Sequence, residues 1–214
     1  MLVFAKEKLV FLSVPKTGTT AYQDALGGRA SLVLRDPPEL KHAPVFRYNR
    51  FFRPALEKFC GEGFDILAVM REPIDWLGSW YRYRRRSGKE GARTSTHDLS
   101  FDDFVLAYMK GNRPPFANVG SQAKFLEPQK NGTAVTHLFR YEDQKGLADF
   151  LKSRLKTDVS TRKLNQSPSL ELRLSADVET RLRRKCETEF ALYESIGSDG
   201  AYTPLAHGEA PAHQ

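Results

Sequence analysis

A lysine in a hydroxyl-rich turn is the first feature of this sequence that could do chemistry. In "FLSVPKTGTT" an apolar run is followed by Pro15, Lys16, Thr17, Gly18, Thr19 and Thr20. A cation, a glycine that lets the backbone come close, and N–H groups at the start of a helix together favour a bound anion. The same letters also fit an ordinary turn with a solvated lysine. The rest of the chain must decide between the two interpretations.

A second candidate anion site lies in "REPIDWLGS", residues 71–79. Arg71 follows an apolar run, and Ser79 lies eight residues on, inside the helix that Pro73 opens. Eight residues span a little over two turns, so Ser79 shares a helix face with the first turn near Arg71. Ligands bind beyond the carboxyl ends of parallel strands, so both motifs would open on one rim of a sheet. Two anion sites on one rim suit a ligand with two separate acidic groups.

The elements that must position these motifs alternate along the chain. Strands are predicted by apolar, β-branched runs at residues 8–14, 31–35, 64–71 and 132–140. Helices are predicted at residues 18–28, 73–86, 100–110, 144–155 and 175–197, and at 43–59 with a break near Pro54. This order indicates an α/β fold with a mostly parallel central sheet flanked by helices. We expect one domain over residues 1–197 and a disordered, small and polar tail over 198–214.

The composition narrows the class of partner. The chain has 214 residues and a net charge of +7, which favours an anionic ligand. The basic run "YRYRRRSGK" could be a nucleic-acid patch. Because it follows Ser79 directly, a rim that attracts a small anion explains it as well, and we expect no nucleic-acid partner.

Three further absences in the sequence bear on location and cofactors. Cys60 and Cys186 lie far apart in no metal-ligand spacing, which favours two free thiols. The five histidines form no metal-binding pattern, so no metal is expected. Charged residues at positions 6–8 interrupt the apolar N-terminal stretch. We therefore expect no signal peptide, no stable membrane insertion and a cytoplasmic location.

The two anion motifs together resemble those of a known enzyme family. "PKTGTT" resembles the 5′-phosphosulfate loop of sulfotransferases that use 3′-phosphoadenosine 5′-phosphosulfate (PAPS), and "REPIDWLGSWY" resembles their 3′-phosphate motif. "FRYEDQKGLADFL", "KLNQSP" and "FALYESIG" resemble segments of bacterial and Golgi-type sulfotransferases, so the resemblance covers residues 8–197. It implies a P-loop-like three-layer fold and a soluble, bacterial-type enzyme. The enzyme would transfer a sulfuryl group from PAPS to a hydroxyl or amine of a small-molecule, lipid or carbohydrate acceptor.

The resemblance also implies a role for each motif residue. Lys16 would hold the oxygen that bridges phosphate and sulfate, and the other residues of the 15–20 turn would wrap the 5′-phosphate. Arg71 and Ser79 would hold the 3′-phosphate. Arg162 and Lys163 lie before "LNQS" in a loop that would close over the nucleotide. There the cytosolic branch of the family has Arg-Lys-Gly, whereas this chain has Arg-Lys-Leu.

His42 in "ELKHAPVF" is the candidate base that would deprotonate the acceptor. Related sulfotransferases carry a histidine in a comparable setting. A histidine with a pKa near its reference value of ~6.5 can take a proton at neutral pH. A helix-capping or surface role is the alternative for His42. Glu39, and less favourably Asp36, are the alternative bases.

Two other functions are compatible with a strand–loop–helix anion site. One is a nucleotide kinase or another NTP-dependent enzyme, but the pattern GxxxxGK[ST] is absent and the lysine precedes the glycine. No carboxylate clearly follows a second strand to bind magnesium. The other is a non-catalytic, sulfotransferase-like protein that binds a nucleotide or a polyanion. A position of His42 far from Lys16 would favour this last function.

Overall fold

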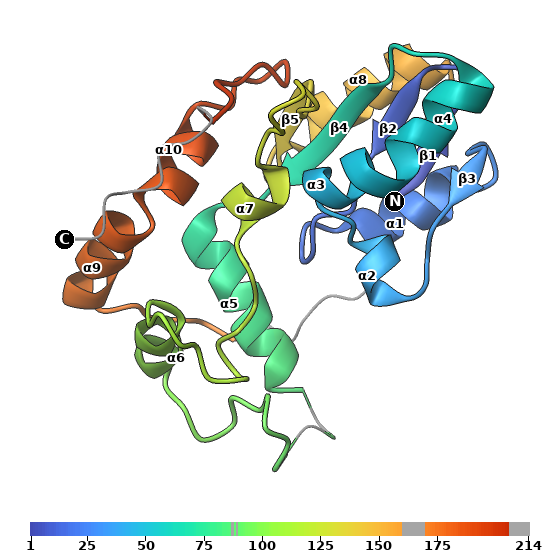
Figure 1. Cartoon of the computed structure of the whole chain (residues 1–214). Helices are drawn as coiled ribbons and strands as arrows, with labels where there is room; N and C mark the ends of the chain where they lie inside the picture. Colours follow the sequence, from blue (N-terminus) through green and yellow to red (C-terminus); the bar gives the residue numbers. More distant parts are fainter. Residues whose placement is uncertain (87, 89, 160–169, 206–214) are drawn as a thin grey trace.

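A five-stranded mixed sheet forms the centre of the computed structural model, which describes residues 1–86, 88, 90–159 and 170–205 (Figure 1). The strand order across the sheet is β3-β1-β2-β4-β5. The strands are β1 (Leu2–Phe4), β2 (Leu9–Phe11), β3 (Leu32–Val33), β4 (Asp65–Met70) and β5 (His137–Arg140). The α/β class predicted from the sequence is confirmed.

The sheet is mixed and not mostly parallel, because of one strand that the sequence analysis did not predict. β1 pairs antiparallel with both β2 and β3, whereas the β2–β4 and β4–β5 pairs are parallel. The three charged residues that interrupt the N-terminal apolar stretch form the turn between β1 and β2. Since β1 is inverted relative to both its neighbours, β3 runs in the same direction as β2, β4 and β5. The parallel part that carries the two motifs is therefore intact.

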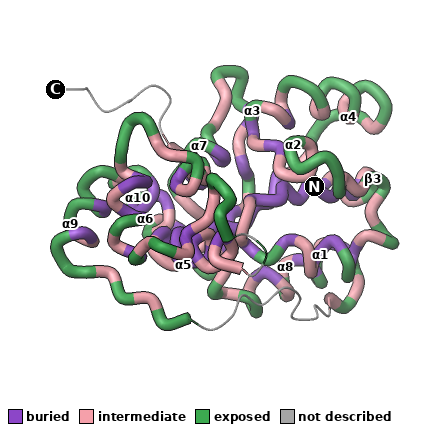
Figure 2. The backbone as a smooth tube through the Cα atoms, turned by 90° about the horizontal axis from the view of Figure 1, so that it is seen from below, coloured by how far each residue is buried: buried purple, intermediate pink, exposed green. Residues whose placement is uncertain are grey.

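Helices cover both faces of this sheet. One face packs against α1 (Thr19–Leu26) and α8 (Gln144–Leu155). The other packs against α3 (Val45–Arg47), the wider helical turn η1 (Tyr48–Phe52), α4 (Arg53–Cys60), α7 (Gln122–Leu126) and α10 (Glu187–Glu194). The short α2 (Pro38–Lys41) precedes α3. A third apolar cluster joins α10 to α5 (Pro73–Arg84), α6 (Phe101–Tyr108) and α9 (Ala176–Lys185) beside the sheet. Buried residues follow the sheet and the inner sides of these helices (Figure 2).

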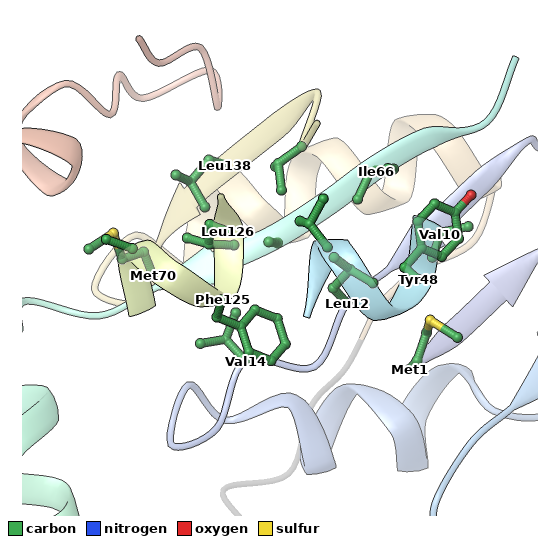
Figure 3. Packing of buried hydrophobic residues seen from close by; sticks show 14 of the residues in the cluster. Met1, Val10, Leu12, Val14, Tyr48, Ile66, Met70, Phe125, Leu126 and Leu138 are labelled. Carbon is green, nitrogen blue, oxygen red and sulfur yellow. The ribbon is translucent and has the colours of Figure 1, made fainter. Parts of the chain in front are cut away.

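Side chains of the strands alternate between the two faces. In β2 and the residue after it, Leu9 and Phe11 face α1 and α8, whereas Val10 and Leu12 face the other core cluster. Figure 3 shows Val10 and Leu12 in that cluster together with Tyr48. Each of these five side chains is at least 98 % buried. The alternation follows from the two-residue period of a strand and explains why the central runs are apolar throughout.

Most helices lie where the sequence predicts them, but the short α2 and α7 are not predicted and two predicted helices differ locally. The predicted break near Pro54 is absent, because η1 ends just before it and Pro54 lies in the first turn of α4, where proline is tolerated. The predicted helix over 175–197 is instead divided at Cys186, whose backbone is not helical. Cys186 and Cys60 are both free, as predicted.

Part of the tail that we expected to be disordered packs on the body of the protein. The backbone N–H of Leu138 donates to the carbonyl of Gly200 at 3.0 Å, and the Tyr202 hydroxyl donates to the carbonyl of Val135. Leu205 adds to the core cluster on that face of the sheet. Residues 206–214 lie outside the described residues. In the part of the chain that the structure describes, no helix is both long enough and apolar enough to cross a membrane.

Candidate functional site

The two sequence motifs lie next to each other at the carboxyl ends of two paired parallel strands. In the β2–β4 register Phe11 is opposite Leu67, and the N–H of Leu12 continues the ladder by donating to the Leu67 carbonyl at 2.9 Å. The 15–20 turn follows β2 and leads into α1, and Arg71 follows β4 and leads into α5. The expected common rim is present.

The 15–20 turn has an unusual backbone. Lys16 and Gly18 both have positive φ values, 66° and 73°. The Thr17 hydroxyl is buried and donates to the Val14 carbonyl at 2.8 Å, which closes the turn. A Cβ on Gly18 would lie 3.1 Å from the ring of Tyr141, so this position suits glycine in both conformation and space. Positive φ is uncommon for a non-glycine residue, and Lys16 shares it with Lys8 in the β1–β2 turn and Lys156 at the end of α8, so the conformation alone assigns no function.

The start of α1 has donors available for an anion. Gly18 is its N-cap, and no side chain of the described residues caps this helix. The first N–H groups of a helix lack partners within it, and the helix dipole places partial positive charge there. Thr19 is buried in the first turn, and the hydroxyl of Thr20 accepts from Lys41 Nζ at 3.3 Å. The turn therefore presents backbone donors of the kind that bind an anion at a helix N-terminus.

The ammonium of Lys16 lies against aromatic rings of α5. Its Nζ is 4.5 Å from the centroid of the Tyr83 ring and 5.8 Å from that of Trp80. No carboxylate among the described residues pairs with it. Burial, and to a smaller extent the nearby guanidinium groups of Arg86, Arg71 and Arg82, lower the pKa of Lys16 to about 8. Such a cluster of cations stabilises a bound anion, because the anion relieves their mutual repulsion.

Arg71 joins the second motif to the first. Its Nη1 donates to the Lys16 carbonyl at 3.2 Å, and its Nε donates to Asp75 at 2.6 Å. Its guanidinium stacks 4.4 Å from the centroid of the Tyr141 ring. Asp75 also accepts from Arg82 at 3.2 Å, so a single carboxylate bridges two of the cations. Nε and one N–H of Nη1 are engaged, so Nη2 and the second N–H of Nη1 are the Arg71 donors left for a ligand among the described contacts.

Two buried side chains that the sequence analysis did not single out for this role fix the loops. The amide of Gln122, on α7, donates to the Arg71 carbonyl at 2.9 Å and accepts from the Arg71 N–H at 3.0 Å. The indole N–H of Trp76 donates to the Pro15 carbonyl at 2.9 Å. A lone glutamine carries no sequence signal for this role, because its partners are far away along the chain.

Ser79 is the predicted site residue with the fewest contacts that support a binding role. It is buried on α5, two turns into the helix. Its hydroxyl makes no hydrogen bond to Arg71 or to the 15–20 turn within the described residues. Arg162 and Lys163, the other two predicted ligand residues, lie outside the described residues.

His42 contacts the segment that joins β2 to the turn. Its Nδ1 is 2.7 Å from the carbonyl oxygen of Ser13, three residues before Lys16. A carbonyl only accepts, so Nδ1 carries the hydrogen and Nε2 is left as an acceptor. Burial lowers the pKa of His42, with a smaller contribution from Lys41, and the hydrogen bond to Ser13 opposes this only in part. A neutral imidazole with an available Nε2 has the protonation state that a general base needs.

The alternative bases are placed less favourably. Asp36 and Glu39 are both exposed. The backbone carbonyl of Glu39 accepts a hydrogen bond from Arg47 at 2.6 Å, and its carboxylate forms no hydrogen bond or ion pair within the described residues. Neither carboxylate contacts the 15–20 turn within the described residues. Of the three candidates, His42 is the one whose side chain is half-buried and hydrogen-bonded to the segment between β2 and the 15–20 turn.

The chain is not matched by any protein-family model, by any curated protein or by any solved structure. The resemblance to sulfotransferases therefore stays one of short motifs, and the geometry of the site carries the functional argument. Among the described residues, no group of three or more His, Cys, Asp or Glu side chains is placed to bind a metal. A groove of about 760 Å³ lies elsewhere, between α6 and α9, and none of the candidate residues lines it.

The lowered pKa of Lys16 predicts a pH-dependent effect on stability. The folded-state pKa of about 8 lies below the ordinary value of 10.5, so the unfolded state binds more protons between these two pH values. Charged, half-buried Lys16 therefore destabilises the fold below pH 8, and this penalty disappears as the pH rises toward 10.5. Lys16→Met should raise the free energy of unfolding at pH 7 by roughly 1–2 kcal/mol, after allowance for solvent access.

Urea unfolding of both proteins across this pH range measures the difference. The stability gain of Lys16→Met should shrink steadily above pH 8. Lys16→Arg is the control, because its charge persists throughout this range. A constant gain at all pH values would show that Lys16 is not destabilised by its surroundings.

Proposed function

We propose that the protein is a PAPS-dependent sulfotransferase that acts through a metal-free anion site, with its activity carried by residues 1–197. The observation that supports this best is the hydrogen bond from Arg71 to the Lys16 carbonyl. It joins two cationic loops, each at the end of a parallel strand, into one site for two separate anionic groups. In this proposal the β2–turn–α1 unit is P-loop-like, with backbone donors around the 5′-phosphate.

The contacts of the site assign a role to each residue that would bind the nucleotide. The N–H groups of the turn and the Thr20 hydroxyl would receive the 5′-phosphosulfate. The Thr17 hydroxyl already donates to Val14, so Thr17 would contribute its backbone N–H. Nη2 of Arg71 would bind the 3′-phosphate. Ser79, Arg162 and Lys163 retain the binding roles that the motifs suggest.

The chemistry follows from the charges of these groups. The bond between the phosphate oxygen and sulfur breaks while the acceptor oxygen or nitrogen bonds to sulfur from the opposite side. Negative charge builds on the departing phosphate, and Lys16 neutralises it. The acceptor's proton passes to Nε2 of His42, and 3′-phosphoadenosine 5′-phosphate (PAP) leaves. Positioning and electrostatics supply most of the rate in such a transfer.

The 3′-phosphate assignment predicts that the protein prefers PAP to AMP. A charge-assisted hydrogen bond contributes ~1.5–3 kcal/mol, so PAP should bind roughly tenfold tighter or more. Arg71→Ala should remove most of this preference and leave the affinity for AMP nearly unchanged. Calorimetric titration of both nucleotides measures these affinities, and Arg184→Ala, an exposed cation on α9, is the control.

Equal affinities for PAP and AMP in the unmodified protein would reject the assignment. A loss of AMP binding in Arg71→Ala would show instead that Arg71 acts by shaping the turn through Lys16.

The base assignment predicts a variant that binds but does not react. His42→Ala should keep its PAP affinity and lose ~10²–10⁴-fold in transfer of labelled sulfate from PAPS to a hydroxyl or amine acceptor. The acceptor is first found by incubating the unmodified protein with a panel of such compounds. Glu39→Gln is the matched control and should remain active. Full activity in His42→Ala would reject His42 as the base, and loss of activity in Glu39→Gln would assign that role to Glu39.

A further inference from the structure

The helical segment over residues 45–60 has an outer face that is unusual for a protein surface. It consists of α3, η1 and α4 in direct succession. Its exposed positions recur about every four residues, which places them on one outward stripe along the segment (Figure 2). The stripe consists of Phe46, Arg50, Phe51, Pro54, Ala55, Lys58 and Phe59. It holds three phenylalanines and two cations and lacks any carboxylate.

The three phenylalanines of this stripe are strongly exposed. Phe46, Phe51 and Phe59 are 47 %, 58 % and 79 % exposed. No other aromatic side chain in the described part of the chain is classed as exposed. Single exposed apolar residues are ordinary, but the collection of all exposed aromatic rings on one segment indicates an interaction surface.

The opposite side of the segment packs on the core and thereby keeps the stripe facing outward. Val45 and Tyr48 are fully or almost fully buried, and Phe52 and Leu56 pack against the same core cluster. The segment therefore cannot turn to bury its phenylalanines without losing its contacts with the sheet. The outward stripe extends over 14 residues, from Phe46 to Phe59, or ~21 Å of helix.

A cation accompanies each exposed ring. Arg47 stacks on Phe46, Arg50 on Phe51 and Lys58 on Phe59, with charge-to-centroid distances of 5.5, 5.3 and 5.5 Å. None of these three cations forms an ion pair with a carboxylate among the described residues. The acidic residue of the segment, Glu57, is paired with Arg53 at 2.7 Å. The surface is thus both aromatic and positively charged.

We propose that this stripe binds the surface of an anionic phospholipid membrane. Helices that lie in a membrane interface combine aromatic side chains, which enter the headgroup region, with Lys and Arg, which attract anionic lipids. The stripe has both at matched positions, on a rigid helix. The repeated cations and the absence of acid favour an anionic lipid surface over a second copy of this chain, whose stripe would carry the same charges. The attachment is peripheral and does not depend on the nucleotide chemistry of the rim.

Vesicle flotation tests this surface directly. The full chain should float with vesicles of phosphatidylcholine mixed with phosphatidylglycerol. Its affinity for vesicles of phosphatidylcholine alone should be lower by roughly tenfold or more. The triple variant Phe46→Ser, Phe51→Ser, Phe59→Ser should lose binding by about tenfold or more. Arg50→Gln, Lys58→Gln should have a similar effect, and high salt should weaken the unmodified protein.

The matched control is Arg184→Gln, Lys185→Gln on α9. This variant removes two exposed cations, and so the same net charge as Arg50→Gln, Lys58→Gln. The two cations line a groove whose one aromatic lining residue, Phe116, is not classed as exposed. It should bind vesicles as the unmodified protein does. Circular dichroism and PAP binding should be unchanged in all variants, because the altered side chains are exposed and lie outside the rim.

Three results would overturn the proposal. The first is equal binding of the phenylalanine variant and the unmodified protein. The second is an equal loss in the α9 control, which would reduce the effect to net charge. The third is absence of vesicle binding together with a dimer in light scattering that the phenylalanine variant abolishes, which would assign the stripe to a second copy.

Discussion

The parallel pairing of β2 with β4 is the constraint on which the candidate site depends. It fixes the ends of the two strands side by side, so the turn after β2 and the loop after β4 must share one rim. Two hydrogen bonds then join the loops, from Arg71 to the Lys16 carbonyl and from Trp76 to the Pro15 carbonyl. Gln122 holds the Arg71 peptide from a third element. The geometry of the candidate site is therefore fixed by strand pairing together with these side-chain-to-backbone hydrogen bonds.

This rigidity is needed because the site places like charges together. Lys16 is half-buried near three arginines, and Asp75 compensates only two of them. The left-handed backbone conformation of Lys16 adds local strain. Both costs are borne by the fold in the absence of a ligand, and a bound anion would relieve the electrostatic one. Such a site is expected where positioning and charge, and not a reactive side chain, supply most of the catalysis.

The sequence predicts the local parts of this arrangement and misses the long-range ones. Strong apolar runs and helix punctuation correctly locate β2, α1, β4, α5 and α8. β1 is missed because its apolar run has only three residues and is followed at once by charged residues. Its antiparallel pairing with both neighbours makes the sheet mixed. Within the site, motif spacing locates Lys16 and Arg71. The contacts of Gln122 and of the Trp80 and Tyr83 rings depend on tertiary packing, which leaves no local pattern.

We propose that the rim binds a 3′-phosphoadenosine nucleotide through protein cations and without a metal. The most direct measurement is calorimetric titration of PAP and of ATP, each with excess EDTA and again with magnesium. We predict that PAP binds tightly in EDTA, that magnesium does not strengthen its binding, and that ATP binds weakly under both conditions. Binding of ATP that requires magnesium and exceeds that of PAP would contradict the account and would indicate an NTP-dependent enzyme instead.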